Sequence, residues 1–246
     1  MYSQTIRPEA VGSAIPFVPR GERTPTLRDL FKAQPIETLP AGAALFWEGD
    51  QATQIFDVLE GVMRVYRIMP DGRRAIMGFI HPGDVLGVSF RDRYLFTAEA
   101  VTTVKVRRFA RGRFFAMINE SPALRPQLFA ILCDEMSAAQ DQLLLLGRKT
   151  AEERVVSFLL AVHRKTNGGH EIELPMSRQD MADYLGLTIE TVSRMMTSLS
   201  RRGLIASHGR HSVTLRKLSA LREIAGEDDD GTEPSAIQLR QAVWPN

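Results

Sequence analysis

The sequence predicts an α+β protein in which an N-terminal antiparallel β-roll is followed by a long helix and a C-terminal winged helix-turn-helix. Three observations predict this fold. Short apolar runs separated by turn residues occupy residues 35–110, a heptad pattern follows Pro126, and two short capped helices meet at Gly186. We therefore expect five segments: a flexible arm over 1–25, the β-roll over 26–120, a dimerisation helix over 121–147, the winged helix-turn-helix over 148–220 and an acidic tail over 221–246.

Composition limits the class of protein. The 246 residues suffice for two domains, and 44% hydrophobic with 24% charged residues is typical of a globular protein. The single cysteine, Cys133, excludes an internal disulfide framework, a four-cysteine zinc site and an iron–sulfur cluster held by the cysteines of one chain. No apolar run approaches the roughly 18 residues of a membrane span, and the N-terminus lacks a signal-peptide core. We therefore expect a cytoplasmic protein without a membrane partner.

The net charge of +2 conceals an uneven distribution of charge along the chain. Residues 174–218 contain seven basic and three acidic side chains, which gives +4. Residues 219–246 contain six acidic and two basic side chains, which gives −4. A basic module next to an acidic tail indicates a nucleic-acid partner for the module and a disordered tail.

Turn residues divide the β-region into short strands. Apolar, β-rich runs predict strands over 55–59, 62–68, 75–80 and 98–106, and Asp71-Gly72 between two of them predicts a hairpin. Many short strands with glycine turns are typical of an antiparallel sandwich or barrel. Four prolines within the first 25 residues predict a mobile N-terminal arm.

Apolar residues spaced alternately three and four apart follow Pro126. This heptad seam predicts a helix that pairs with a second copy of the chain, so that we expect a homodimer. A helix packed only on its own domain remains the alternative. The seam, and thus the expected dimer interface, consists of Phe129, Leu132, Met136, Ala139, Leu143 and Leu146. The residues expected to cover the β-roll beside it are Leu128, Ile131, Leu144 and Leu145.

Two short helices with clear start and stop signals follow. Ser177 is a good N-cap with Asp180 in a capping-box position, Gly186 ends this first helix, and Thr188 caps the second. Apolar residues on one face of each helix predict that the two pack together as a helix-turn-helix, whose second helix is available for the major groove of DNA. Residues 203–215 alternate around a glycine turn and predict a two-stranded wing.

The exposed start of the second helix carries side chains that can recognise bases. Glu190 can accept a hydrogen bond from cytosine, and Arg194 can form a bidentate pair with guanine. Their spacing of four residues lets Glu190 pair with Arg194, and an ordinary surface ion pair is the alternative interpretation. The residues expected at DNA phosphates lie near helix N-termini and in the wing: Ser177, Arg178, Gln179, Thr191, His208 and Arg210. A solvated polar surface is the alternative for these.

Residues 35–220 resemble the CRP/FNR superfamily of bacterial transcription regulators. The run Glu190–Arg194 is similar to the FNR side of that superfamily, and residues 174–188 and Phe96–Val101 resemble FixK proteins. The resemblance implies a jelly roll like those that bind cyclic nucleotides and a homodimeric activator that reads a TTGAT-N4-ATCAA palindrome through Glu190, Ser193 and Arg194. It also implies RNA polymerase as a partner and control of low-oxygen or nitrogen-related genes.

The sequence departs from the superfamily in two places. The first 50 residues contain no cysteine, so the oxygen-sensing [4Fe–4S] cluster has no thiolates there. The loop Gly83–Gly87 is present, but Phe96 and Thr97 stand where cyclic-AMP receptors place an Arg-Ser pair. Without that guanidinium a buried phosphate loses its charge partner, so we expect neither cyclic-nucleotide binding nor a cofactor. Cys133 is the candidate redox site, and a buried inert thiol is the alternative.

We therefore expect a regulator that binds DNA without an effector, and two other functions remain as alternatives. The β-roll could sense haem, nitric oxide or another small molecule, with His81 as an axial haem ligand. A cupin-like metalloenzyme is the more remote alternative, because only His81 among the five histidines falls in the β-region and a metal site there is poorly supplied. We therefore expect a protein that is not an enzyme and has no metal site.

Overall fold

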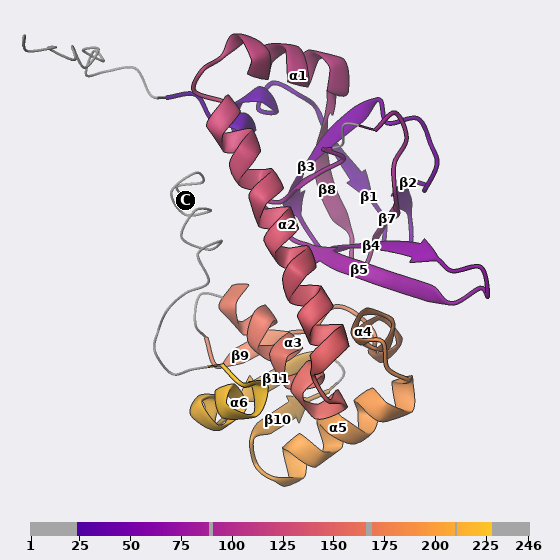
Figure 1. The fold of residues 1–246 in the computed structure, drawn as a ribbon, viewed down its shortest axis with the longest axis vertical. Coiled ribbons are helices and arrows are strands. Elements are labelled where there is room, and N and C mark those ends of the chain that lie inside the picture. The colour runs from indigo at the N-terminus through magenta and orange to yellow at the C-terminus, as the bar shows by residue number, and fades with distance from the viewer. Residues whose placement is uncertain (1–23, 89–90, 166–168, 210, 228–246) are drawn as a thin grey trace, which may run out of the picture.

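The computed structural model describes residues 24–88, 91–165, 169–209 and 211–227, so most of the expected arm and much of the acidic tail lie outside it (Figure 1). The first part of the chain forms a 3-10 helix and eight strands: η1 (Leu27–Leu30), β1 (Ile36–Leu39), β2 (Ala44–Phe46), β3 (Gln54–Glu60), β4 (Met63–Ile68), β5 (Arg74–Ile80), β6 (Val85–Leu86), β7 (Thr97–Ala100) and β8 (Val104–Ala110). The remaining elements are α1 (Arg111–Glu120), α2 (Arg125–Arg148), α3 (Ala151–Lys165), β9 (Glu171–Glu173), α4 (Arg178–Leu185), α5 (Ile189–Arg201), β10 (Ile205–His208), β11 (Ser212–Leu215) and α6 (Leu218–Ala225).

Two four-stranded antiparallel sheets form the β-roll, in the strand orders β1-β8-β3-β6 and β2-β7-β4-β5. Apolar side chains of both sheets, such as Phe56, Val58 and Met63, are buried between them. The prediction of an N-terminal antiparallel roll followed by a long helix and a helix-turn-helix is therefore confirmed. No helix among the described residues is long and apolar enough to span a membrane.

The hairpin predicted at Asp71-Gly72 joins β4 to β5. Gly72 has a φ of 82°, and its N–H donates to the carbonyl of Met69. The single strand predicted over 98–106 is wrong, because this segment forms β7 and β8 with a turn between them. Thr102 lies in that turn, where its hydroxyl oxygen accepts a hydrogen bond from the N–H of Val62 at 3.0 Å.

A second apolar cluster joins the β-roll to the long helix α2. Phe31, Phe109 and Phe114 pack edge to face or tilted, and Leu128 on α2 belongs to the same buried cluster. Buried Gln127 donates to the carbonyl of Pro25 and accepts from the N–H of Leu27. The start of α2 is thus anchored to the β-roll by apolar and polar contacts.

The C-terminal domain packs α3, α4, α5 and α6 around a small sheet. The predicted wing is present as β10 and β11, but β9 adds a third strand in the order β10-β11-β9. The sequence did not reveal β9, because a strand of three residues has too little periodicity to be recognised. Ile172 of β9 is fully buried in the same core as Val213 of β11.

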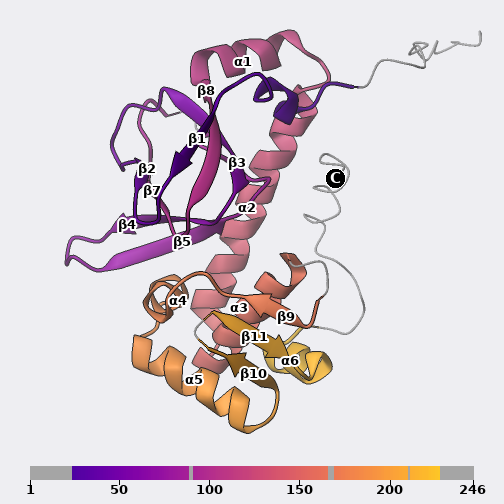
Figure 2. The same cartoon turned by 180° about the vertical axis from the view of Figure 1, so that it is seen from behind.

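The helix α2 runs along the length of the molecule and connects the two domains. The β-roll lies beside its first part and the C-terminal domain surrounds its end, with the β4–β5 hairpin next to α4 (Figures 1 and 2). The two domains are therefore in contact through β5 and α4 as well as through α2.

Candidate nucleic-acid interface

The N-terminus of α4 is built by the predicted capping box. The hydroxyl oxygen of Ser177 accepts from the N–H of Asp180 at 3.0 Å, and the Asp180 carboxylate accepts from the N–H of Ser177 at 3.1 Å. The remaining N–H groups of the first turn point outward from the helix end, as the geometry of a helix N-terminus requires. This end of α4 is suited to an anionic partner.

The turn between α4 and α5 has the geometry expected from its glycine. Gly186 adopts a φ of 61°, and its N–H donates to the carbonyl of Ala182. The hydroxyl oxygen of Thr188 then accepts from the N–H of Thr191 at 3.2 Å and caps α5. Ala182 and Val192 are buried in one shared core, so the two helices pack against each other.

The first turns of α5 are exposed to solvent. Glu190, Ser193 and Arg194 are all exposed, as residues that meet base edges must be. Backbone and Thr188 hydrogen bonds lower the pKa of Glu190, so this side chain is an ionised acceptor at neutral pH. Within the part of the chain that the structure describes, no ion pair joins Glu190 to Arg194; Arg194 donates instead to the hydroxyl of Thr191 at 3.3 Å. Both charged groups therefore remain available to bases.

A cavity of about 360 Å³ adjoins this exposed surface. It is lined by Arg178, Ser193, Met196, Thr197, Ser200, Arg201 and Ser207. Burial lowers the pKa of Arg178, whose guanidinium still carries its charge at neutral pH. The sequence reasoning missed Thr197, Ser200, Arg201 and Ser207. A helical spacing of four from Ser193 to Thr197 and to Arg201 is the signal that could have revealed part of this polar stripe.

The residues expected at DNA phosphates lie around the same surface. Ser177 and Gln179 are exposed at the start of α4, where Gln179 donates to Asp183 at 2.7 Å. His208 is exposed at the end of β10 and hydrogen-bonds the hydroxyl of Thr214 at 2.9 Å. Arg210 lies outside the described residues.

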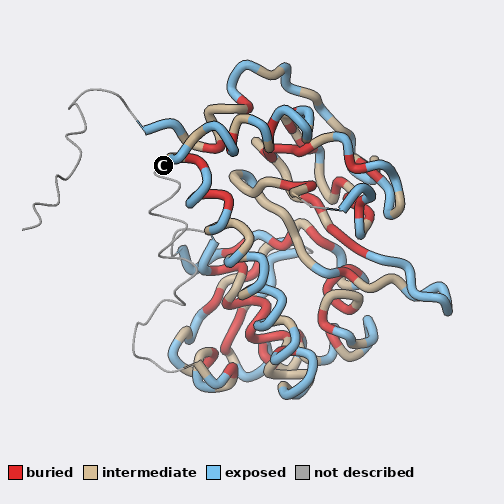
Figure 3. Tube along the Cα trace, turned by 45° about the horizontal axis from the view of Figure 1, so that its top comes forward, coloured by how far each residue is buried: buried red, intermediate tan, exposed pale blue. Residues whose placement is uncertain are grey.

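The outer face of α2 carries most of the predicted seam. Phe129, Met136 and Leu143 are 65%, 58% and 72% exposed, whereas Leu132 packs partly against the β-roll core. Exposed and buried segments alternate along the long helix (Figure 3). Leu146 lies at the start of the C-terminal domain and is 38% exposed. Ala139 is also exposed.

Two expectations about α2 are wrong. Leu144 and Leu145 are expected to cover the β-roll beside Leu128, but Leu144 is 60% exposed and Leu145 is buried in the core of the C-terminal domain. The reason is that the first part of α2, with Leu128 and Ile131, lies against the β-roll, whereas the end of α2 packs into the C-terminal domain. Cys133 is exposed, which contradicts the alternative of a buried thiol.

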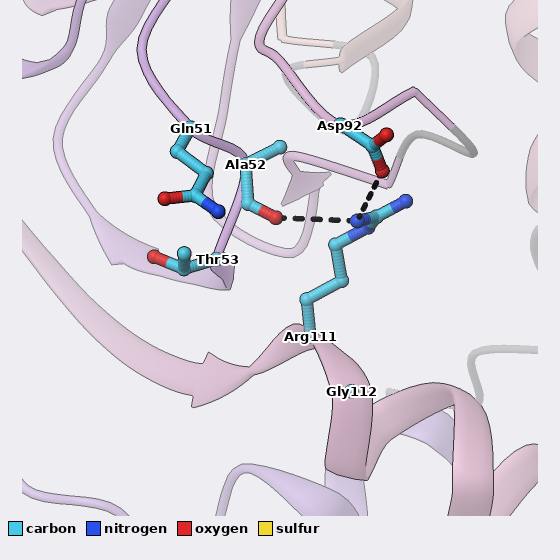
Figure 4. Close-up of a pocket in the computed structure, with 6 residues that line it drawn as sticks. All are labelled: Gln51, Ala52, Thr53, Asp92, Arg111 and Gly112. Carbon is cyan, nitrogen blue, oxygen red and sulfur yellow. Dashed lines mark hydrogen bonds and ion pairs between the residues drawn. The ribbon is translucent and has the colours of Figure 1, made fainter.

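A second cavity, of about 310 Å³, lies in the β-roll at the start of α1, far from α5 (Figures 1 and 4). Arg111 reaches across it toward Asp92, with 3.8 Å between Nη1 and Oδ1, and donates to the carbonyl of Ala52 at 3.4 Å. The described residues contain no group of three or more histidine, cysteine, aspartate or glutamate side chains that could hold a metal ion.

Two family models match the two domains. Residues 36–121 match the cyclic nucleotide-binding domain, and residues 153–224 match the Crp-like helix-turn-helix domain. With a roll, a connecting helix and an exposed recognition helix, the chain has the architecture of a DNA-binding transcription regulator, and it belongs to the CRP/FNR family.

Comparison with individual relatives identifies the group within that family. The chain is 46% identical over 170 residues to the nitrogen fixation regulation protein FixK of Bradyrhizobium diazoefficiens, covering 68% of this chain and 72% of the relative. It is 37% identical to the transcriptional activator FnrL of Cereibacter sphaeroides, covering 79% and 82%. The structure of FixK2 from Bradyrhizobium japonicum superposes with a TM-score of 0.75 at 34% identity, covering 78% and 96%. The chain is thus a regulator of the FixK type.

Proposed function

We propose that the protein is a homodimeric activator of transcription that reads an inverted repeat of the form TTGAT-N4-ATCAA and acts without a bound effector. The observation that carries the proposal is the exposed start of α5, where ionised Glu190 and unsequestered Arg194 stand beside a basic polar cavity. In the major groove, glutamate can accept a hydrogen bond from cytosine, and arginine can donate two hydrogen bonds to guanine. Ser193 is the third base reader, on the same exposed face.

The exposed apolar face of α2 supports the homodimer. Phe129, Met136 and Leu143 lie about two turns apart on one helix face and leave a long apolar strip in contact with water. Such a strip is stabilised when it is covered by its two-fold copy. A two-fold dimer presents two α5 helices to an operator with two-fold symmetry, about one turn of DNA apart.

The interior of the β-roll supports action without a cyclic nucleotide. Phe96 packs against Phe46, whose ring stacks on Tyr94 with centroids 3.8 Å apart. Thr97 is buried and its hydroxyl oxygen accepts from the N–H of Glu48. The positions that would grip a cyclic phosphate thus present an aromatic ring and an occupied hydroxyl. Activity is then set mainly by the amount of the protein.

The relatives suggest the processes and partners involved. Because FixK of Bradyrhizobium diazoefficiens is named for the regulation of nitrogen fixation, we assign this protein to nitrogen-related or low-oxygen gene control in the cytoplasm. An activator must also contact RNA polymerase, the third partner that we propose.

Arg194→Ala tests the proposal most directly. The variant loses a bidentate contact, so we expect binding of TTGAT-N4-ATCAA to weaken by about 1–3 kcal/mol per half-site and discrimination at the contacted guanine to relax. The measurement is a titration of each protein against the operator and single-base variants at fixed salt. Arg148→Ala is the matched control, because it removes the same charge from the exposed end of α2.

The same titration separates the alternatives. Equal affinity of Arg194→Ala and the parent for the operator contradicts the assignment of base readers. A parent that binds only after haem or nitric oxide is added supports a sensing β-roll and overturns the effector-free proposal.

A further inference from the structure

The carboxylate of Asp180 has contacts in both domains. Its Oδ2 atom completes the capping box of α4 by accepting from the N–H and the hydroxyl of Ser177. Its Oδ1 atom accepts from the Arg64 guanidinium at 3.0 Å and from the Arg74 guanidinium at 2.5 Å, both in the β-roll. The group that shapes the start of the helix-turn-helix is therefore also bound to the β4–β5 hairpin.

Other partly buried polar groups extend this contact. Arg74 donates from Nε to the Asp183 carboxylate at 2.8 Å, and Arg64 forms an ion pair with Glu99 of β7. The side chains of Arg64 and Arg74 are only 17% and 23% exposed, and that of Asp180 is 4% exposed. Ion pairs at such depth are geometrically restrained, unlike pairs on an open surface.

The other end of α4 is also held. Phe79 of β5 packs against Tyr184 of α4 with ring centroids 5.5 Å apart. The Gln142 amide of α2 donates to the carbonyl of Tyr184 at 2.8 Å, and Arg154 of α3 donates to the carbonyl of Leu185 at 3.0 Å. Because α4 and α5 share one buried core, a rotation of α4 on the hairpin would carry α5 with it.

We propose that Arg64 and Arg74 are positioning residues that fix the orientation of the helix-turn-helix on the β-roll and thereby set the spacing between the two half-sites that the dimer reads. This inference rests on the proposed function, since it assumes a palindromic operator. Neither arginine lies on the exposed surface of α5, so neither reads bases. In a dimer joined through α2, the orientation of each C-terminal domain decides how far apart the two α5 helices lie and at what angle they meet the groove.

Loss of these contacts changes spacing selectivity rather than base recognition. A loosened α4 lets α5 reach half-sites at several separations, while the side chains at its surface stay the same. We therefore expect Arg74→Gln to lower the preference for the best spacer over spacers one base pair shorter or longer by roughly three- to tenfold. The affinity for a DNA with one half-site should stay within about twofold of the parent.

The experiment uses the full-length protein and a set of operators with spacers of different length. Arg73→Gln is the matched control, because this neighbouring arginine is 81% exposed and forms an ion pair with Asp71 of the same hairpin. Arg74→Lys keeps the charge and should recover part of the spacer preference. Asp183→Asn removes a partner of Arg74 from the other domain and should reproduce the direction of the effect if Arg74→Gln folds poorly.

Hydrogen exchange gives a readout without DNA. We expect amides of α4 and of β5 to exchange faster in Arg74→Gln than in the parent or in Arg73→Gln, because the contact between the two domains opens more often. Unchanged exchange overturns the proposed positioning role.

The outcomes separate this inference from the proposed function. A parent that prefers no palindrome overturns both. A parent with a clear spacer preference that Arg74→Gln retains overturns the inference alone. An equal loss of affinity for all spacers and for the single half-site shows a merely structural role and also overturns it.

Discussion

Asp57 is a buried carboxyl whose surroundings disfavour its charge. It lies in β3, is 2% exposed, and has Arg28 at 3.8 Å and Arg107 directly across on β8. Burial raises the pKa of this carboxyl, against the opposing effect of Arg28 and Arg107, and the effect of burial is the larger. The charged form is therefore disfavoured in the folded state.

Asp57→Asn should gain stability relative to the parent as the pH rises. Because the folded-state pKa lies above the ordinary value of 3.8, the parent keeps the full contribution of this group only below that value and loses it as the pH rises through the folded pKa. Asparagine does not titrate, so the difference in the free energy of unfolding should move in favour of the variant toward neutral pH. Chemical denaturation at several pH values measures it.

Asp71→Asn is the control with the opposite sign. Hydrogen bonds from Arg73 lower the pKa of this exposed carboxyl. The free energy of unfolding of the parent should therefore rise relative to that of the variant as the pH rises. If the difference in the free energy of unfolding between Asp57→Asn and the parent does not change with pH, the proposed effect of burial on Asp57 is wrong.

At the scale of elements, the turn between α4 and α5 depends on one glycine. Gly186 has a φ of 61°, and a Cβ added there would lie 3.4 Å from Leu146 and 3.6 Å from Arg154. The space is sufficient, so the cost of a side chain comes from the backbone conformation itself.

Gly186→Ala should lower the free energy of unfolding by about 1–2 kcal/mol, because an L-residue is strained in the left-handed region. Thermal or urea denaturation of the full chain measures this. Gly112→Ala is the control, since Gly112 lies within α1 with no atom within 4 Å of an added Cβ and should be neutral or slightly stabilising. Equal losses for both variants would show that the turn conformation is not the cause.

At the scale of the whole molecule, the exposed face of α2 is expected to hold two chains together. Leu143 is the most exposed of its apolar residues, at 72%, and makes little contribution to the core of its own chain. Leu143→Glu should therefore leave the fold intact and convert a dimer to a monomer, because the two-fold axis would bring two carboxylates together in an apolar strip.

Sedimentation equilibrium and circular dichroism test this expectation together. Ala138→Glu is the control, because Ala138 is exposed on α2 but off the predicted seam. We expect the monomeric variant to lose palindrome binding by at least about tenfold, as two linked sites bind more tightly than one. A dimer that persists in Leu143→Glu would place the interface elsewhere.

Contacts between residues close in sequence could be predicted from sequence. The capping box of Ser177 with Asp180, the cap at Thr188, the turn at Gly186 and the hairpin at Asp71-Gly72 are all made within a few residues. Their chemistry is decided by residue type and spacing, and they were sufficient to define the helix-turn-helix and the exposed position of Glu190 and Arg194.

Contacts between residues distant in sequence became visible once the chain was folded. The order of roll, long helix and helix-turn-helix, and the apolar seam along that helix, could be predicted from residue pattern. That pattern did not reveal that Asp180 also binds Arg64 and Arg74, more than 100 residues away, that β9 joins the wing, or that Leu144 is exposed. The physical reason is that capping and turn formation depend on local backbone geometry, whereas ion pairs between domains and the burial of a helix face depend on which surfaces packing brings together.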